Sequence, residues 1–272
     1  MSAAPSSFTH ALVRTPAPCL VQALGQNAGQ ASREDGEAWT VAIDYQLALR
    51  QHATYVGALR EFGLTIVPVA PLLDYADACF VEDTAVVFGD AALVTRPGAP
   101  SRRGEEESVA WVLGNLGLAL TRMLPPATLD GGDVLRVGNT FFVGRSERTN
   151  REGIAALAAF AAHIDPTARV VVVDLPPDLL HLKCHVSALS DDTVLAVANL
   201  ALDLPTGVRR IDLPRAEAFA ANAVAHNSGV LVAAGHARAA EILAAAGFLP
   251  RPLDTSEFKK AAGSLTCLSV LC

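Results

Sequence analysis

Four short segments of the sequence carry reactive or charged side chains inside otherwise apolar stretches. They are Asp-Ala-Cys-Phe-Val-Glu-Asp at 77–83, Asp-Gly-Gly-Asp at 130–133, His-Leu-Lys-Cys-His at 181–185, and the cysteine at 267. Adjacent carboxylates beside an apolar strand are costly to bury unless a cation or a donor satisfies them. A cysteine, a histidine and several acids are the groups that a thiolate nucleophile, its acid/base and an orienting acid require. The combination favours nucleophilic catalysis by a cysteine.

Each segment also has a purely structural interpretation. The acids at 77–83 are compatible with a solvated strand edge, and Asp-Gly-Gly-Asp is compatible with a plain turn. His181, Cys184 and His185 suggest a metal site, but zinc needs three or four ligands. On a strand, Cys184 points away from both histidines. We therefore expect no metal and no other cofactor.

Composition excludes several classes of protein. The chain has 272 residues and a net charge of −7, without a basic tract, so we expect no nucleic-acid partner. Apolar runs stay shorter than the ~18 residues of a membrane span, and the first residues lack a secretory pattern. Five cysteines at scattered spacings then indicate free thiols in a reducing, cytoplasmic compartment.

Helical and strand patterns alternate along the whole chain. Apolar residues recur at helical spacing from Ala38 to Phe62, Gly63 is the expected stop, and a strand follows at 65–69. The further helices that we predict are one opened by the glutamates at 105–107, one capped by Asn150 over 151–163, one over 236–246 that stops at Gly247, and a short one behind an Asp254–Glu257 capping box.

Four pairs of apolar strands surround polar turns at 89–90, 138–139, 191–192 and 227–229. The first strand, THALVR, and the last, SLTCLSVLC, have no hairpin partner, and pairing them closes a fifth unit. Five units of about 54 residues predict a ring of ββαβ modules, in which each helix packs against the next module. An ordinary doubly wound sheet is the alternative, but its sheet is parallel and lacks hairpins. We expect one domain over residues 1–272.

Longer motifs in the sequence point to a known family. FVEDTAVV, VTRPGAPSRRGE, ATLDGGDVL, FFVGRSERTN, LHLK and SLTCLSVL occur in this order. On these motifs the chain resembles the dimethylarginine dimethylaminohydrolases, members of the guanidine-modifying enzyme superfamily. The resemblance implies an α/β fold, the five-bladed α/β propeller called the pentein fold. It also implies hydrolysis of Nω,Nω-dimethyl-L-arginine or its monomethyl analogue to L-citrulline and an amine.

The resemblance further implies a role for individual residues. Cys267 is the nucleophile, His181 the acid/base, and Asp130 the acid that orients it. The substrate-binding residues that the resemblance implies are Asp77, Glu82 and Asp83 for the guanidinium, Arg102 and Arg148 for the α-carboxylate, and Leu24 for a backbone contact to the amino-acid end. Carboxylates beside Cys267 raise the thiol pKa above its usual ~8.5. We hypothesise that the cationic substrate lowers it again.

Three other functions stay open at this stage. An arginine deiminase acts on unmethylated arginine, and an amidinotransferase passes the amidino group to another amine, but such relatives are usually longer than this chain. A non-catalytic pentein that binds ribosomal subunits is opposed by the retained nucleophile and by the acidic net charge. We expect a small-molecule substrate as the partner, no membrane partner, and leave a homodimer open.

Overall fold

Each expected hairpin forms at its turn. The computed structural model describes residues 8–27 and 42–272. Over these residues the strands are β1 (His10–Arg14), β2 (Thr65–Val69), β3 (Ala85–Phe88), β4 (Ala91–Val94), β5 (Ala119–Arg122), β6 (Val134–Val137), β7 (Thr140–Arg145), β8 (Arg169–Asp174), β9 (Val186–Ser190), β10 (Thr193–Val197), β11 (Arg209–Leu213), β12 (Val224–His226), β13 (Gly229–Ala233), β14 (Leu249–Leu253) and β15 (Val270–Leu271).

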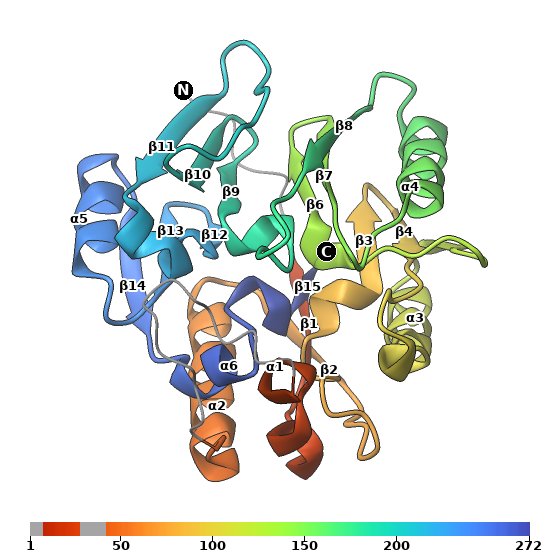
Figure 1. The fold of residues 1–272 in the computed structure, drawn as a ribbon, viewed down its shortest axis with the longest axis horizontal. Helices are drawn as coiled ribbons and strands as arrows, with labels where there is room; N and C mark the ends of the chain where they lie inside the picture. The colour runs from red at the N-terminus through yellow and green to blue at the C-terminus, as the bar shows by residue number, and fades with distance from the viewer. Residues whose placement is uncertain (1–7, 28–41) are drawn as a thin grey trace.

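The strands form five three-stranded sheets in the described part of the chain, arranged around a central axis (Figure 1). In every sheet the middle strand pairs antiparallel with one neighbour and parallel with the other, as β4 does with β3 and β5. The first sheet joins the two ends of the ring, because β15 pairs antiparallel with β1, opposite Ala11 and Leu12. The expected five-bladed α/β propeller is confirmed.

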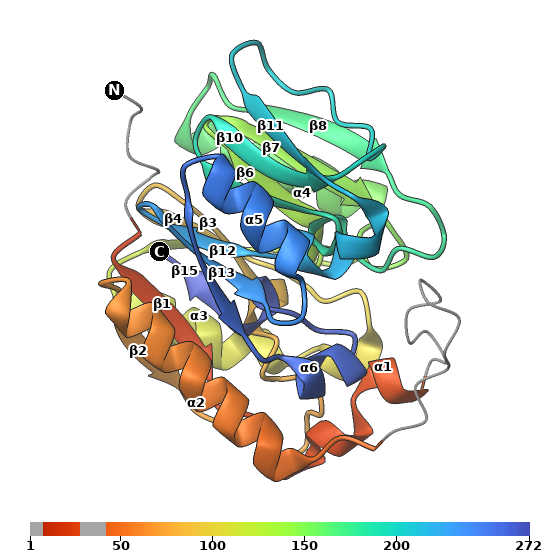
Figure 2. The same ribbon diagram turned by 90° about the vertical axis from the view of Figure 1, so that its left-hand side faces the viewer.

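Helices cross from the middle strand of a sheet to its third strand. They are α1 (Leu24–Asn27), α2 (Tyr45–Glu61), α3 (Glu105–Asn115), α4 (Arg151–Ile164), α5 (Ala237–Ala245) and α6 (Ser256–Lys260), of which α1 and α6 are short additions outside this pattern. Figure 2 shows α2 and α5 on the outer side of the ring. The cap at Asn150 is confirmed, since its side chain accepts from the Gly153 amide. Gly247 follows α5 at a φ of +96°, which favours glycine as a helix stop.

Two expected helical features are wrong. The fourth module has no helix between β10 and β11, although residues 198–208 are all described. Leucines at 200, 202 and 204 recur with the period of an extended chain, and they pack against the apolar core between the third and fourth sheets. The capping box at Asp254–Glu257 is also absent, because the Glu257 carboxylate accepts instead from the Asp44 amide at 2.8 Å, at the start of α2.

The long second helix begins later than its apolar pattern predicts. Its first residue is Tyr45, and the Asp44 side chain caps it by accepting from the Leu47 amide. The predicted residues 38–41 lie outside the described part of the chain. The helix ends as expected before Gly63, and the φ angle of Gly63 is +96°.

The apolar core runs along the seams between neighbouring sheets. One seam packs strands β3 and β4 against β6, β7 and α4, and Phe88 and Phe141 meet there edge to face with ring centroids 5.0 Å apart. Apolar burial at such seams holds each module to the next. In the described residues, no helix has the length and apolar character to cross a membrane.

Candidate active site

A short 3₁₀ helix precedes the first strand of every sheet in the described chain. We call these five segments the entry helices; they are Val81–Thr84, Gly131–Asp133, Leu182–Cys184, Arg215–Ala221 and Thr266–Leu268. Contacts link Thr266–Leu268 to Val81–Thr84 and continue through the next three in order around the ring. The repeat of the fold therefore brings residues that are far apart in the sequence to one place near the axis.

Two entry helices correct the expected strands. We expected Cys184 on a strand and the acids at 82–83 at the edge of one, but residues 81–84 and 182–184 each close one turn. The Thr84 hydroxyl donates to the Val81 carbonyl at 2.7 Å, and the Cys184 amide donates to the His181 carbonyl at 3.1 Å. The argument that a strand turns Cys184 away from the histidines does not apply. Burial and nearby carboxylates raise the pKa of its thiol to about 12.

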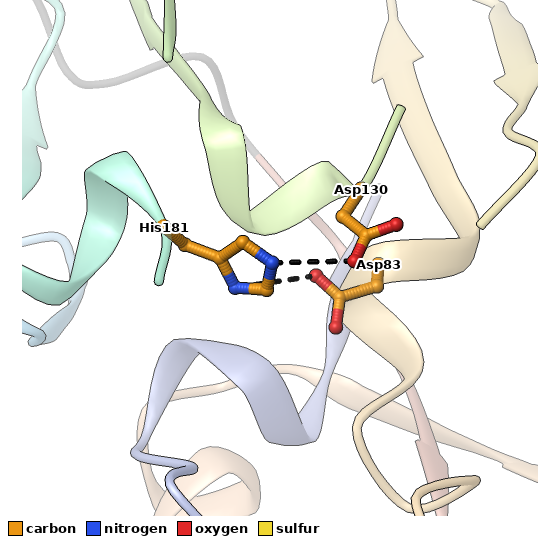
Figure 3. Close-up of side chains that lie close together, drawn as sticks. All are labelled: Asp83, Asp130 and His181. Atoms are coloured by element: carbon orange, nitrogen blue, oxygen red, sulfur yellow. Dashed lines mark hydrogen bonds and ion pairs between the residues drawn. The ribbon is translucent and has the colours of Figure 1, made fainter. Parts of the chain in front are cut away.

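The His181 imidazole points toward two buried carboxylates, those of Asp130 and Asp83 (Figure 3). Its Nε2 is 3.2 Å from Asp130 Oδ2, and its Nδ1 is 4.0 Å from Asp83 Oδ1. Burial by itself lowers the pKa of His181, but the charges of Asp83, Asp133 and Asp130 outweigh it and raise the pKa to about 9. The imidazole is thus a cation at neutral pH and carries a proton that it can donate.

Asp133 is a buried acid to which the sequence assigned no role. Its carboxylate accepts from the Leu182 amide at 3.1 Å and from the hydroxyls of Ser146 and Thr149 at 2.6 and 2.7 Å. These bonds tie the entry helix after His181 to the preceding module. Its place in the Asp-Gly-Gly-Asp motif is the signal that identifies it.

Arg102 is buried, and each of its three guanidinium nitrogens donates to a protein acceptor. Its guanidinium donates to Asp83 Oδ2 at 2.5 Å, to the Glu105 carboxylate, and to the Phe80 carbonyl at 2.9 Å. Burial raises the pKa of Glu105 and the charge of Arg102 lowers it. The net result is a pKa of about 7. The same arginine and His181 overcome the burial of Asp83 and lower its pKa to about 2. Arg102 therefore holds the carboxylates of the site in place, and its expected contact with a substrate carboxylate stays a prediction.

Asp77, Leu24 and Arg148 lie together at another part of the site. Both Asp77 carboxylate oxygens accept from the Leu24 amide, at 3.3 and 3.2 Å. Burial raises the pKa of Asp77, against the opposing charges of Arg102 and Arg148. Arg148 is partly exposed, and among the described residues no hydrogen-bond acceptor or ion-pair partner is found for its guanidinium. This arginine is available to a ligand.

One cavity collects most of the predicted residues. Of the nine, seven line it: Leu24, Asp77, Asp83, Arg102, Arg148, His181 and Cys267. Asp130 is completely buried behind His181. Cys267 is partly exposed, and burial together with the charges of Glu82 and Asp83 raises the pKa of its thiol well above the ordinary value.

Glu82 does not line this cavity. It lines a separate hollow along the axis, where Lys183 Nζ lies 2.7 Å from Glu82 Oε1 and the Thr266 hydroxyl donates to Glu82 Oε2 at 2.7 Å. Both of its carboxylate oxygens thus have protein partners, and the expected contact with a guanidinium stays a prediction. The sequence singled out neither Lys183 nor Thr266 as a partner of this acid.

Gly132 lets the backbone pass close to His181 and Asp83. Its amide donates to Asp83 Oδ1 at 2.9 Å. A Cβ at this position lies only 2.7 Å from His181 Nδ1 and 2.9 Å from Asp83 Oδ1. Any side chain here displaces the imidazole or the carboxylate. The glycine of the Asp-Gly-Gly-Asp motif is therefore required by close approach rather than by a turn.

Asp83, Asp130 and His181 are also the one group of described residues whose donor atoms lie within 4.8 Å of one another, as a metal site requires. All three side chains already have protein partners. Asp83 is paired with Arg102, and Asp130 is paired with the His181 imidazole. The arrangement suits a shared proton, and Cys184 is not part of it. The expectation of no metal stays a prediction.

Comparisons with known proteins agree on one family. The family model described as arginine deiminase matches residues 115–229. The N(G),N(G)-dimethylarginine dimethylaminohydrolase of Streptomyces coelicolor is 42% identical over 96% of this chain and 95% of its own. The enzyme of the same name from Pseudomonas aeruginosa is 33% identical over 97% of this chain and 99% of its own.

Solved structures extend the agreement to the fold. A mutant of the Pseudomonas aeruginosa enzyme complexed with citrulline matches with a TM-score of 0.86 and 32% identity, over 98% of this chain and 100% of that one. A second dimethylarginine dimethylaminohydrolase structure, an adduct with S-methyl-L-thiocitrulline, also matches with a TM-score of 0.86. With a site of this geometry and relatives matched over almost their whole length, the chain belongs to the dimethylarginine dimethylaminohydrolase family.

Proposed function

We propose that this protein hydrolyses Nω,Nω-dimethyl-L-arginine, and its monomethyl analogue, to L-citrulline and dimethylamine or methylamine. The ring acts as one catalytic domain, with Cys267 as the nucleophile and His181 as the acid/base. The observation that carries the proposal is the cavity that the partly exposed Cys267 shares with His181, two carboxylates and Arg148, whose guanidinium has no partner among the described residues. Each end of a zwitterionic substrate with a cationic side chain finds an opposite charge there.

Substrate binding follows from the distribution of these charges. Arg148 takes the α-carboxylate, because its donors are free of described protein partners. Asp77 lies beside the Leu24 amide and in the field of Arg148, so it takes the α-ammonium and not the guanidinium that the resemblance implies. Asp83 takes the guanidinium N–H groups, since its low pKa keeps it ionised. A planar cation held by a charge-assisted bond presents its central carbon to the sulfur.

Bond formation starts at the thiol. The Cys267 proton passes to solvent as the cationic substrate arrives, because a positive charge beside the sulfur favours the thiolate. The sulfur attacks the guanidinium carbon, and the bond from that carbon to the dimethylated nitrogen breaks. His181 gives its proton to this nitrogen, so that dimethylamine leaves as a neutral amine.

Hydrolysis restores the thiol. His181, now neutral and held by Asp130, removes a proton from a water that attacks the S-alkylthiouronium carbon. The carbon–sulfur bond breaks, the second water proton passes from the oxygen to the departing sulfur, and citrulline leaves with its ureido carbonyl while Cys267 is restored as a thiol. The reaction depends on a reduced cysteine, which is the basis for placing it in the cytoplasm.

One assay tests the proposal and its nearest alternative. The match to the arginine deiminase model favours unmethylated arginine as the second candidate substrate. We expect citrulline from dimethylarginine at a higher kcat/KM than from arginine, and almost none from the folded Cys267→Ser variant. More than a few per cent of activity in that variant excludes Cys267 as the nucleophile. A preference for arginine identifies a deiminase.

A further inference from the structure

Asn222 is a buried side chain that touches two of the segments carrying the proposed catalytic residues. It follows the entry helix Arg215–Ala221 and is 3% exposed. Its Oδ1 accepts from the Thr266 amide at 2.8 Å. Its Nδ2 donates to the Thr266 hydroxyl and to the Lys183 carbonyl, both at 3.0 Å. One side chain thus makes three hydrogen bonds to two other modules.

These bonds fix the two reacting groups relative to each other. Thr266 directly precedes Cys267, and Lys183 lies two residues after His181 in the same turn. Asn222 does not line the cavity that contains both reacting groups. It therefore touches the backbones that carry the nucleophile and the acid/base, without reaching the space left for the substrate.

The direction of each bond requires an amide at this position. The Thr266 hydroxyl donates its own proton to Glu82, so it must accept from Asn222. The Lys183 carbonyl can only accept, and the Thr266 amide can only donate. A carboxylamide supplies two donors and an acceptor together. The ion pair between Glu82 and Lys183 connects the two residues that Asn222 contacts, because Glu82 also accepts from Thr266.

We propose that Asn222 is a positioning residue that sets the distance between the Cys267 sulfur and the His181 imidazole. The inference rests on the proposed cysteine hydrolysis. A displacement of about 1 Å between reacting groups costs on the order of 10²-fold in rate. Removal of Asn222 therefore lowers kcat by about that factor. KM stays within about twofold, because the substrate contacts are untouched.

Two variants of Asn222 and one matched control test this role with the full chain. Asn222→Ala removes all three bonds. Asn222→Asp keeps the size of the side chain but replaces the donating NH₂ group with an oxygen that faces the Thr266 hydroxyl and the Lys183 carbonyl. This variant takes the place of Asn222→Ala if the alanine variant folds poorly. The control is Ser187→Ala, because the buried Ser187 hydroxyl donates to the Ala221 carbonyl and accepts from the Ala223 amide on either side of Asn222.

The double variant of Asn222→Ala with Thr266→Val tests whether Asn222 acts on Cys267 through Thr266. If Asn222 acts through Thr266, adding Thr266→Val to Asn222→Ala lowers kcat by less than the product of the two separate losses. Independent multiplication of the two losses contradicts that route and overturns the proposal.

We expect both Asn222 variants to lose kcat at constant KM, and Ser187→Ala to keep kcat within about twofold at a comparable loss of Tm. An equal loss of kcat in Ser187→Ala, or full kcat in both Asn222 variants, overturns the proposal. Amide hydrogen exchange gives a readout that needs no substrate: Asn222→Ala speeds exchange over residues 264–268, and Ser187→Ala does not. A wild type that makes no citrulline refutes the proposed function, whereas unchanged exchange refutes the role of Asn222.

Discussion

Asp83 Oδ2 lies 2.5 Å from Arg102 Nη1, while Asp83 Oδ1 accepts from the Gly132 amide and lies 4.0 Å from His181 Nδ1. One carboxylate thus stands between a permanent cation and a titrating one. Arg102 keeps Asp83 ionised, and Asp83 in turn favours the protonated imidazole. The arginine is therefore part of the fixed electrostatics of the site, and Arg148 is the arginine left to a ligand.

Replacing Arg148 weakens substrate binding without weakening the fold. A hydrogen bond to a charged group contributes about 1.5–3 kcal/mol, which corresponds to a rise in KM of roughly 10- to 100-fold for Arg148→Ala. Its guanidinium has no described protein partner to leave behind, so the free energy of unfolding changes by less than about 0.5 kcal/mol. Steady-state kinetics and urea unfolding measure the two effects. An unchanged KM contradicts the assignment.

Replacing Arg102 acts on the fold itself. Arg102→Ala leaves the Asp83 and Glu105 carboxylates buried without their cation. Breaking a buried pair by removing one partner costs about 3–5 kcal/mol. Urea unfolding should show this loss together with loss of activity. A stable Arg102→Ala variant with only a raised KM would return Arg102 to the substrate-binding role that the sequence implies.

The proton on His181 makes stability depend on pH. Its pKa rises from 6.5 to about 9 in the folded protein. A raised pKa means that the protonated form stabilises the fold, fully below about pH 6.5, and that this stabilisation is lost as the pH rises through about 9. We therefore expect the Tm advantage of the wild type over His181→Gln to shrink across this window. An advantage that stays constant from pH 6 to pH 10 is inconsistent with the raised pKa.

The Cys267 thiol should respond to ligand charge. Burial, Glu82 and Asp83 raise its pKa in the free protein, and a bound guanidinium brings the compensating charge. The pH midpoint of Cys267 alkylation by iodoacetamide is therefore expected to fall when a cationic arginine analogue is present at sub-saturating concentration. A neutral analogue, citrulline, is the control. An equal midpoint with both ligands would falsify substrate activation of the thiol.

Gly132→Ala is expected to abolish activity. The added Cβ meets His181 Nδ1 at 2.7 Å and Asp83 Oδ1 at 2.9 Å, so the pair that holds the proton must move apart. Gly57→Ala is the control, because Gly57 lies inside α2 with nothing within 4 Å of its Cβ position. Alanine there stabilises the helix by about 0.5–1 kcal/mol. Equal citrulline production by both variants argues against close packing at Gly132.

Local signals in the sequence were sufficient for most of the fold. Each hairpin has its turn residues within the hairpin, and Asn150 caps its helix three residues away at Gly153. The failures involve distant partners. Glu257 accepts from Asp44, 213 residues earlier, and no spacing near Asp254 reveals this. The missing helix of the fourth module had a local signal, the alternating leucines at 200, 202 and 204, which the assumption of identical modules concealed.

The predictions about the site divide in the same way, into local features that were found and distant pairings that were missed. Residue types and family resemblance predicted which side chains gather around the cavity, and seven of nine line it. They did not predict which charge pairs with which. Arg102 sits three residues before Glu105, a spacing that the sequence shows, but its bond to Asp83 spans 19 residues. Glu82 pairs with Lys183 across 101 residues. Such pairings depend on how the modules meet.

The pairing of β15 with β1 has a consequence for connectivity. In the other four sheets a covalent turn joins the antiparallel strands, and here hydrogen bonds alone do so, including those from the Thr9 and His10 amides to the Cys272 carbonyl. The place in the ring where β15 and β1 meet without a covalent turn therefore does not decide which residues gather at the axis. A circular permutant that links these neighbouring strands and opens the exposed turn at Thr206–Gly207 keeps every entry helix ahead of its strand. Its active site would be assembled from the same five modules, read in a different order.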